Sequence, residues 1–141
     1  MWFRRVAMVG VLVAGTNLAL GATVQAVVKN GTCEGAENCM FDATTIFPSA
    51  GARVYDNGFG DDGDLSGNNF IVNGTGANSG VTVFNAPGAV WNRQATPIAY
   101  SDGYNFAGTT VCVPGSQSRV FTGSFGYFNN ATSSHRERPI C

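Results

Sequence analysis

The sequence predicts an all-β domain, built as an antiparallel sandwich of short strands with Greek-key connections. Two observations support this prediction. Beyond the N-terminal part of the chain, short β-branched and aromatic runs alternate with clusters of Gly, Asn, Asp and Ser, and no stretch there has a helical period. That same part contains all four cysteines of the 141-residue chain, a composition typical of a small disulfide-linked domain.

Residues 1–26 predict a secretory signal peptide. They begin with a basic segment, continue through the mostly apolar Val6–Leu20, and place small residues at the two positions that signal peptidase reads, Val24 and Ala26. The apolar stretch is too short and too interrupted to cross a bilayer core of about 30 Å. We therefore expect cleavage after Ala26, secretion of a domain over residues 27–141, and no membrane contact once the leader is removed.

The charge of the secreted part excludes one class of partner. Acidic side chains outnumber basic ones after the leader, and the largest basic cluster is Arg136 with Arg138. Proteins that bind nucleic acid neutralise phosphates with many lysines and arginines on one face. We therefore expect no nucleic-acid partner, and we expect the domain to be a monomer.

An even number of cysteines in an exported chain indicates disulfides, and three connectivities are possible. A zinc site is disfavoured, because Cys33 and Cys39 lie six positions apart and His135 is the only histidine. We favour Cys33–Cys39 as a local link and Cys112–Cys141 as a clamp on the C-terminal segment.

Strands are expected wherever a β-branched or aromatic run is bounded by turn residues. Asn57-Gly58, Asn73-Gly74 and Pro114-Gly115 are such turns. The expected strands are Arg53–Asp56, Asn69–Val72, Gly80–Phe84, Ala89–Asn92, Pro97–Ser101, Thr109–Val113 and Ser118–Phe121.

The chain also repeats itself loosely. Phe84–Trp91 can be laid over Phe128–His135 at an offset of 44. An aromatic segment that ends on glycine precedes each run, Phe41–Gly51 in the first half and Tyr100–Gly108 in the second. The first unit is longer because it carries a polar insertion, Asp56–Asn69. Two similar units predict a duplicated Greek key.

The second unit resembles a βγ-crystallin motif. Asn129–Ser134 fits the closing pattern Asn/Asp-Asn/Asp-x-x-Ser/Thr-Ser, and Tyr100–Gly108 fits the aromatic-glycine opening with one residue inserted. The exported layout, with an early cysteine pair and Trp91-Asn92-Arg93 at the join, is similar to the actinomycete-type metalloproteinase inhibitor family, and the likeness covers nearly all of residues 33–141. The resemblance implies a βγ-crystallin-like Greek-key β-sandwich with two degenerate motifs.

The same resemblance implies two calcium sites. Each would take a side-chain oxygen from the second position of one closing run and a hydroxyl from the fifth position of the other. The second run offers Asn130 and Ser133, whereas the first, aligned at the offset of 44, offers Ala86 and Ala89. Asn130 is also neutral, while tight calcium sites gain from carboxylate charge. We expect calcium binding to be weak or absent, and no other cofactor.

No catalytic machinery is expected. A nucleophilic triad would have to use His135, which lies inside the closing run, and the sequence has no Gly-x-Ser-x-Gly, His-Glu-x-x-His or P-loop motif. Asp61–Asp64 lies in a glycine-rich loop with nothing to desolvate the acids. The loop resembles the start of an EF-hand, but Asn73 occupies the position of the bidentate glutamate. We interpret the loop as structural.

The resemblance implies an inhibitor of extracellular peptidases, chiefly metallo-endopeptidases, that acts as a rigid substrate mimic. Cys112–Val113 is a candidate reactive bond, because thermolysin-like enzymes favour an apolar residue after the cut. Against it, Thr109–Val113 alternates like a strand. The loops Asp56–Asn69 and Pro114–Arg119 are further candidates. Two alternatives stay open: an antimicrobial or toxin-like effector, and a structural calcium-binding protein of the βγ-crystallin type.

Overall fold

The computed structural model describes residues 29–46, 51–58 and 60–141. The expected signal peptide and its cleavage site lie outside these residues. No helix within the described ranges combines the length and the apolarity that crossing a membrane requires.

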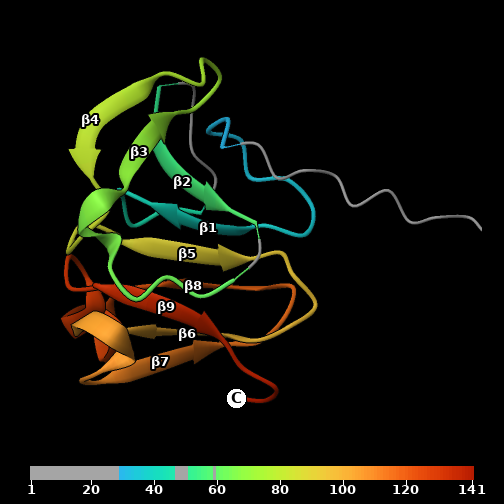
Figure 1. Ribbon diagram of the computed structural model, residues 1–141, viewed down its shortest axis with the longest axis vertical. Coiled ribbons are helices and arrows are strands. Elements are labelled where there is room, and N and C mark those ends of the chain that lie inside the picture. The colour runs from blue at the N-terminus through green and yellow to red at the C-terminus, as the bar shows by residue number, and fades with distance from the viewer. Residues whose placement is uncertain (1–28, 47–50, 59) are drawn as a thin grey trace, which may run out of the picture.

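The described part of the chain forms nine strands and three short 3₁₀ helices, and all strand pairs are antiparallel (Figure 1). The strands are β1 (Asn38–Phe41), β2 (Arg53–Asn57), β3 (Asn69–Val72), β4 (Asn78–Thr82), β5 (Ala89–Asn92), β6 (Ile98–Ser101), β7 (Thr110–Val113), β8 (Gln117–Val120) and β9 (Ser134–Glu137). The helices are η1 (Leu65–Gly67), η2 (Tyr104–Phe106) and η3 (Gly123–Phe128). The predicted all-β class is confirmed.

Most expected strands form within one residue of their expected bounds, and β4 begins and ends two residues early. Strands β1 and β9 escape prediction because their sequences, Asn-Cys-Met-Phe and Ser-His-Arg-Glu, lack a β-branched run. Strand β1 pairs with β2 on one side and β5 on the other. Strand β9 pairs with β6 and is bridged through His135 to Asp62. These two strands therefore form because each is hydrogen-bonded to a neighbouring segment on both sides.

The sheet order reveals a duplicated Greek key. One sheet has the order β4-β3-β2-β1-β5-β8 and the other the order β7-β6-β9. The trio β2-β1-β5 matches the trio β7-β6-β9, and β8, from the second unit, completes the first unit's sheet beside β5. The β3–β4 hairpin extends the larger sheet beyond β2.

The reciprocal strand, which would lie beside β9, is reduced to a short stretch of the polar insertion. The amide of Asp62 donates to His135 O at 2.8 Å, and the amide of His135 donates to Asp62 O at 2.9 Å. Farther along, the amide of Leu65 donates to Ser133 O at 3.0 Å. The insertion therefore contains the first unit's contribution to the second sheet.

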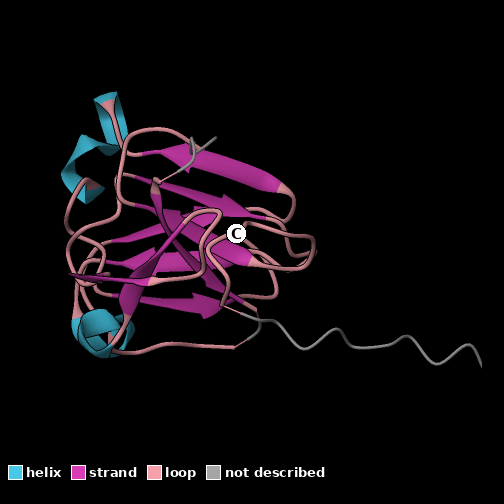
Figure 2. Ribbon diagram, turned by 90° about the horizontal axis from the view of Figure 1, so that it is seen from above, coloured by secondary structure: helices cyan, strands magenta, loops and turns pink. Residues whose placement is uncertain are grey.

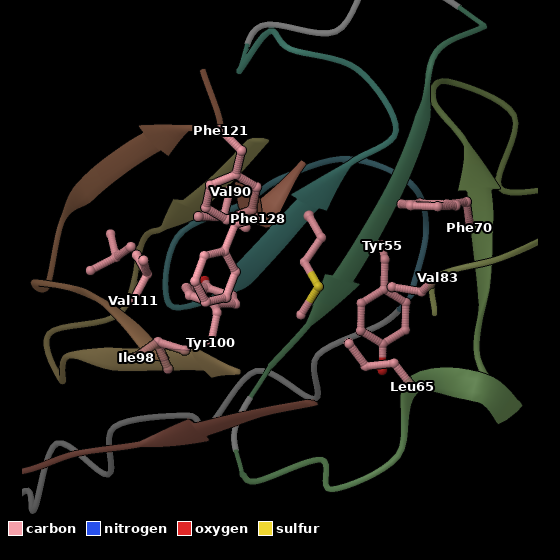
Figure 3. Packing of buried hydrophobic residues seen from close by; sticks show 12 residues of the cluster. Tyr55, Leu65, Phe70, Val83, Val90, Ile98, Tyr100, Val111, Phe121 and Phe128 are labelled. Atoms are coloured by element: carbon pink, nitrogen blue, oxygen red, sulfur yellow. The ribbon is translucent and has the colours of Figure 1, made fainter. Parts of the chain in front are cut away.

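The two inward faces pack into one core (Figure 3). On the larger sheet, Met40 and Val90 alternate with outward-facing neighbours, and Tyr100 on β6 meets them from the smaller sheet. All of these side chains are buried. The remaining buried members of the core are Tyr55, Leu65, Phe70, Val83, Ile98, Val111, Val113, Phe121 and Phe128.

A smaller apolar cluster covers the outward face of the larger sheet. Cys39, Phe41, Val54 and Ala89 are buried there, and Trp91 packs against them. Both disulfides join the pairs that the sequence favours, Cys33 to Cys39 and Cys112 to Cys141. The first disulfide lies at the edge of this outer cluster, and the second ties the C-terminal segment to β7.

Candidate functional site

Three connections meet at the end of the sandwich opposite the short helices. They are the disulfide loop before β1, the β5–β6 connection and the β7–β8 turn, on the right in Figure 1. In the view from above, the short helices gather on the other side (Figure 2). Backbone hydrogen bonds between the three connections fix their relative positions.

The Cys33–Cys39 loop is exposed but firmly held. Its tip, residues 34–36, is exposed, and Ala36 has a φ of +66°. The amide of Ala36 donates to Arg93 O at 3.2 Å, while the amide of Arg93 donates to Glu37 O at 2.8 Å. The loop is thus closed by a covalent bond and bound by its main chain to the end of β5.

Glu37 stabilises this loop from inside. Its carboxylate is buried and accepts a hydrogen bond from the amide of Glu34 at 2.5 Å. Burial raises the pKa of the Glu37 carboxyl. The Glu37 carboxylate and the sulfurs of Cys33 and Cys39 lie within 4.8 Å of one another, but the sulfurs are joined in the disulfide and cannot act as thiolate ligands.

Asn92 holds the other two connections together. The side chain is fully buried, and its Nδ2 lies 3.1 Å from Val113 O and 3.2 Å from Pro114 O. Its Oδ1 accepts from the amide of Gln94 at 3.0 Å, and Gln94 O in turn accepts from the amide of Ser116. A single interior amide therefore positions both the β5–β6 connection and the β7–β8 turn.

A hollow of about 270 Å³ opens between these connections, lined by Gly35, Trp91, Arg93 and Ser116. The Arg93 guanidinium stacks over the Trp91 ring at 4.7 Å, and its Nη1 donates to Cys33 O at 2.5 Å. The hollow thus has an indole and an oriented cation in its wall, next to the exposed disulfide loop.

Comparison with known proteins identifies the fold and nothing narrower. A solved structure described as "Evolution of the eye lens beta-gamma-crystallin domain fold" is similar with a TM-score of 0.55, over 76% of this chain and 90% of that one. This is a βγ-crystallin domain fold. The sequence identity is 13%, so the likeness concerns the fold alone. No family model matches the chain, and no curated protein matches it.

The βγ-crystallin fold corrects the alignment of the two units by one residue. Strand β9 begins at Ser134, which is 45 positions after the start of β5 at Ala89, and not 44. The amides of Asn85 and Asn130 make matching bonds, to Thr132 O at 2.9 Å and to Pro87 O at 3.1 Å, and these pairs are also 45 apart. The expected offset was wrong because it aligned two Phe-Asn pairs, whereas strand pairing sets the true register.

This correction changes the candidate calcium ligands. The first closing run is now Phe84–Ala89, so its second position is Asn85 and its fifth is Gly88. Ala86 and Ala89 do not occupy ligand positions. Asn85 could not be recognised from the sequence, because the offset of 44 placed Ala86 at this position. In the structure, its left-handed φ of +53° matches the φ of +56° at Asn130.

Asn85 and Ser133 meet in the structure. The buried Ser133 Oγ lies 2.9 Å from Asn85 Oδ1, 3.0 Å from Asp102 O and 3.2 Å from Ala131 O. A hydroxyl has one proton and can donate to only one of these oxygens at a time. Such an oxygen-rich group suits a hard cation such as calcium. The opposite pair, Asn130 with Gly88, lacks the hydroxyl.

The structure places the candidate reactive bond inside a strand. Cys112 and Val113 belong to β7, where they pair with Ala99 and Ile98, and the Val113 side chain is fully buried. The pairing agrees with the strand-like alternation of Thr109–Val113 that argued against this bond. Whether a peptidase binds there stays a prediction, and the proposal below rests on another segment.

The acidic loop is braced from within, as its structural interpretation requires. Asp62 Oδ1 accepts from the amide of Asp64 at 3.0 Å, and Asp62 Oδ2 accepts from Asn68 Nδ2 at 2.7 Å. Asp64 Oδ1 accepts from the amide of Ser66 at 2.9 Å. His135, next to this loop, is buried, and burial lowers its pKa to about 4. A histidine enclosed in this way is out of reach of a substrate.

Proposed function

We propose that this chain is a secreted protein inhibitor of extracellular peptidases, and that it presents a pre-ordered loop to a peptidase cleft. The observation that carries the proposal is the Cys33–Cys39 loop, whose exposed tip is closed by a disulfide and hydrogen-bonded at Ala36 and Glu37 to Arg93. A loop ordered before binding loses little conformational entropy in the complex, which is how small inhibitors reach high affinity.

Two further points support the proposal. Disulfides persist in oxidising compartments, which agrees with export by the expected leader. The sequence resemblance favours metallo-endopeptidases as targets. We infer no catalytic activity of the chain itself.

A titration against a panel of extracellular peptidases tests the proposal. The purified secreted domain should inhibit at least one endopeptidase stoichiometrically and reversibly. The double variant Cys33→Ala/Cys39→Ala should lose inhibition, because the opened loop is free to move and is cleaved as an ordinary substrate. The matched control is Cys112→Ala/Cys141→Ala, which leaves the disulfide loop intact and should still inhibit at a temperature where it is folded.

A different outcome would reject the proposal. If neither metallo- nor serine endopeptidases are inhibited at micromolar domain, the chain is not a peptidase inhibitor of this kind. If the two double variants inhibit equally well, the disulfide loop is not the inhibitory segment.

A second candidate function rests on a separate observation, the oxygens gathered around Ser133. They support a structural calcium-binding role of the βγ-crystallin type, with Asn85 and Ser133 supplying side-chain oxygens and Asp102 a carbonyl. The ion would hold the two closing runs together. An increase in the melting temperature on adding calcium tests this role, and an unchanged melting temperature speaks against it.

A further inference from the structure

The hollow lined by Trp91 and Arg93 has in its wall a cation that forms no ion pair within the described residues. In the described ranges, no carboxylate lies within ion-pair distance of Arg93. The ion pair found in these ranges joins two other residues, Arg53 and Asp42. The acidic neighbour Glu37 interacts with the charge of Arg93, which partly offsets the rise in its pKa that burial causes, but it forms no ion pair with the guanidinium, and its carboxylate accepts the amide of Glu34. No carboxylate of the described residues therefore takes the N–H donors of the Arg93 guanidinium, and these can bind a partner.

The guanidinium is also pre-oriented. It stacks on the indole of Trp91 at 4.7 Å and uses one N–H to reach Cys33 O. An arginine presents five N–H donors in a fixed planar fork, so most of its donors are left for a ligand. The planar group that matches such a fork in a bidentate manner is a carboxylate.

The size of the hollow indicates what carries that carboxylate. About 270 Å³ lies just below the range of pockets that enclose a small-molecule ligand, roughly 300–1,000 Å³. Gly35 and Ser116 add little bulk to the rim, and the Trp91 ring lies under the guanidinium and holds it in place. These properties fit a single acidic side chain that projects from a protein surface.

We infer that this hollow receives an aspartate or glutamate side chain of the inhibited peptidase, with Arg93 as its carboxylate receptor. The inference rests on the proposed function, because the hollow adjoins the disulfide loop and the same partner would cover both. The acidic side chain would sit on the rim of the peptidase cleft. Its charge selects among peptidases that would otherwise accept the same loop.

Inhibition by Arg93 variants tests the inference when an inhibited peptidase is in hand. Arg93→Met should weaken inhibition roughly 10- to 100-fold, and Arg93→Lys should recover only part of the loss, because a lysine lacks the planar fork. Arg119→Met is the matched control, since Arg119 stacks on Phe125 at 4.6 Å outside the hollow. Inhibition constants within about twofold of wild type for folded Arg93→Met would overturn the inference while leaving the proposed function intact.

If the panel contains no inhibited peptidase, the proposed function fails and the peptidase is lost as the partner, but a binding assay still tests whether the hollow recognises a carboxylate. Trp91 is the one tryptophan outside the expected leader, so intrinsic fluorescence of the secreted domain reports on this hollow. N-acetylglutamate α-amide should change the emission saturably, with a dissociation constant of roughly 10 mM or tighter. The neutral N-acetylglutamine α-amide should not, and Arg93→Met should abolish the response while Arg119→Met retains it. Equal responses to the two amides, or no saturation, would refute carboxylate recognition.

Discussion

The two Greek-key units place different side chains at matching positions of one interior. Where the first unit directs Met40 and Val90 inward, the second directs Tyr100 and His135. The polar tips of the second pair bond across to the first unit, Tyr100 Oη to Asn38 Oδ1 and His135 Nε2 to Asn57. Apolar packing thus supplies most of the shared core, and a few directional bonds fix how the units sit against each other.

The largest expected loss of stability comes from removing core side chains at matching positions of the two units. Phe128 lies 45 positions after Val83, and both side chains are fully buried. Phe128→Ala should lower the free energy of unfolding by about 3–5 kcal/mol, because it removes a whole ring and leaves a cavity. Val83→Ala removes two methyl groups and should cost about 2 kcal/mol. Urea unfolding measures both losses, and equal losses would contradict the expectation that the cost follows the volume removed from the core.

The disulfides come next, one in each unit. Cys112–Cys141 spans 29 residues and should contribute about 3–4 kcal/mol by restricting the unfolded chain. Cys33–Cys39 spans 6 residues and should contribute about 2 kcal/mol. Chemical denaturation of the two double-alanine variants tests the order. A larger loss from the shorter loop would show that its bond acts in the folded state.

His135 should make the stability of the fold depend on pH, whereas its counterpart in the first unit, Val90, does not titrate. Burial lowers the pKa of His135 from its usual 6.5 to about 4, so between these values the unfolded chain binds a proton that the folded chain does not. Stability should fall as the pH drops from 6.5 to 4, by about 3 kcal/mol in all.

The variant His135→Val should remove this component. The pKa values of Glu37 and Asp56 are raised by burial and act in the opposite direction, but they are present in both proteins. The difference between the two pH profiles therefore isolates the histidine. Parallel profiles would mean that His135 titrates normally in the folded state.

The smallest expected effect is a difference in calcium stabilisation between the closing runs of the two units. Asn85→Asp adds a carboxylate where Ser133 supplies a hydroxyl, so calcium should raise the melting temperature more than in wild type. Asn130→Asp is the matched control, because its opposite residue is Gly88, without a hydroxyl. The Cβ of a side chain at Gly88 would lie 2.8 Å from the backbone of Ala43, so that hydroxyl cannot be added without a shift. Equal calcium responses would refute a site at Asn85.

The sequence is sufficient to predict the fold class and most strands, because these follow from local residue types and spacing. It leaves three disulfide connectivities open, and the structure has the favoured one. It fails for β1 and β9, which lack a β-branched run and form through pairing with their neighbours in space. It also misplaces the repeat, since the Phe-Asn pairs at Phe84 and Phe128 align better in sequence than in space. The hollow at Arg93 is beyond sequence reasoning, because three separate connections build it.

The exchange of strands between the units has a consequence for folding. Strand β8 completes the sheet of the first unit, and the stretch around Asp62 lines the sheet of the second. Neither half is a closed module, so a chain cut in the β5–β6 connection should yield two fragments that acquire structure only on mixing. The intact chain must bring distant segments together before either sheet is complete, which favours slow, all-or-none folding. Circular dichroism of the separate and mixed fragments tests this, and a structured isolated half would refute it.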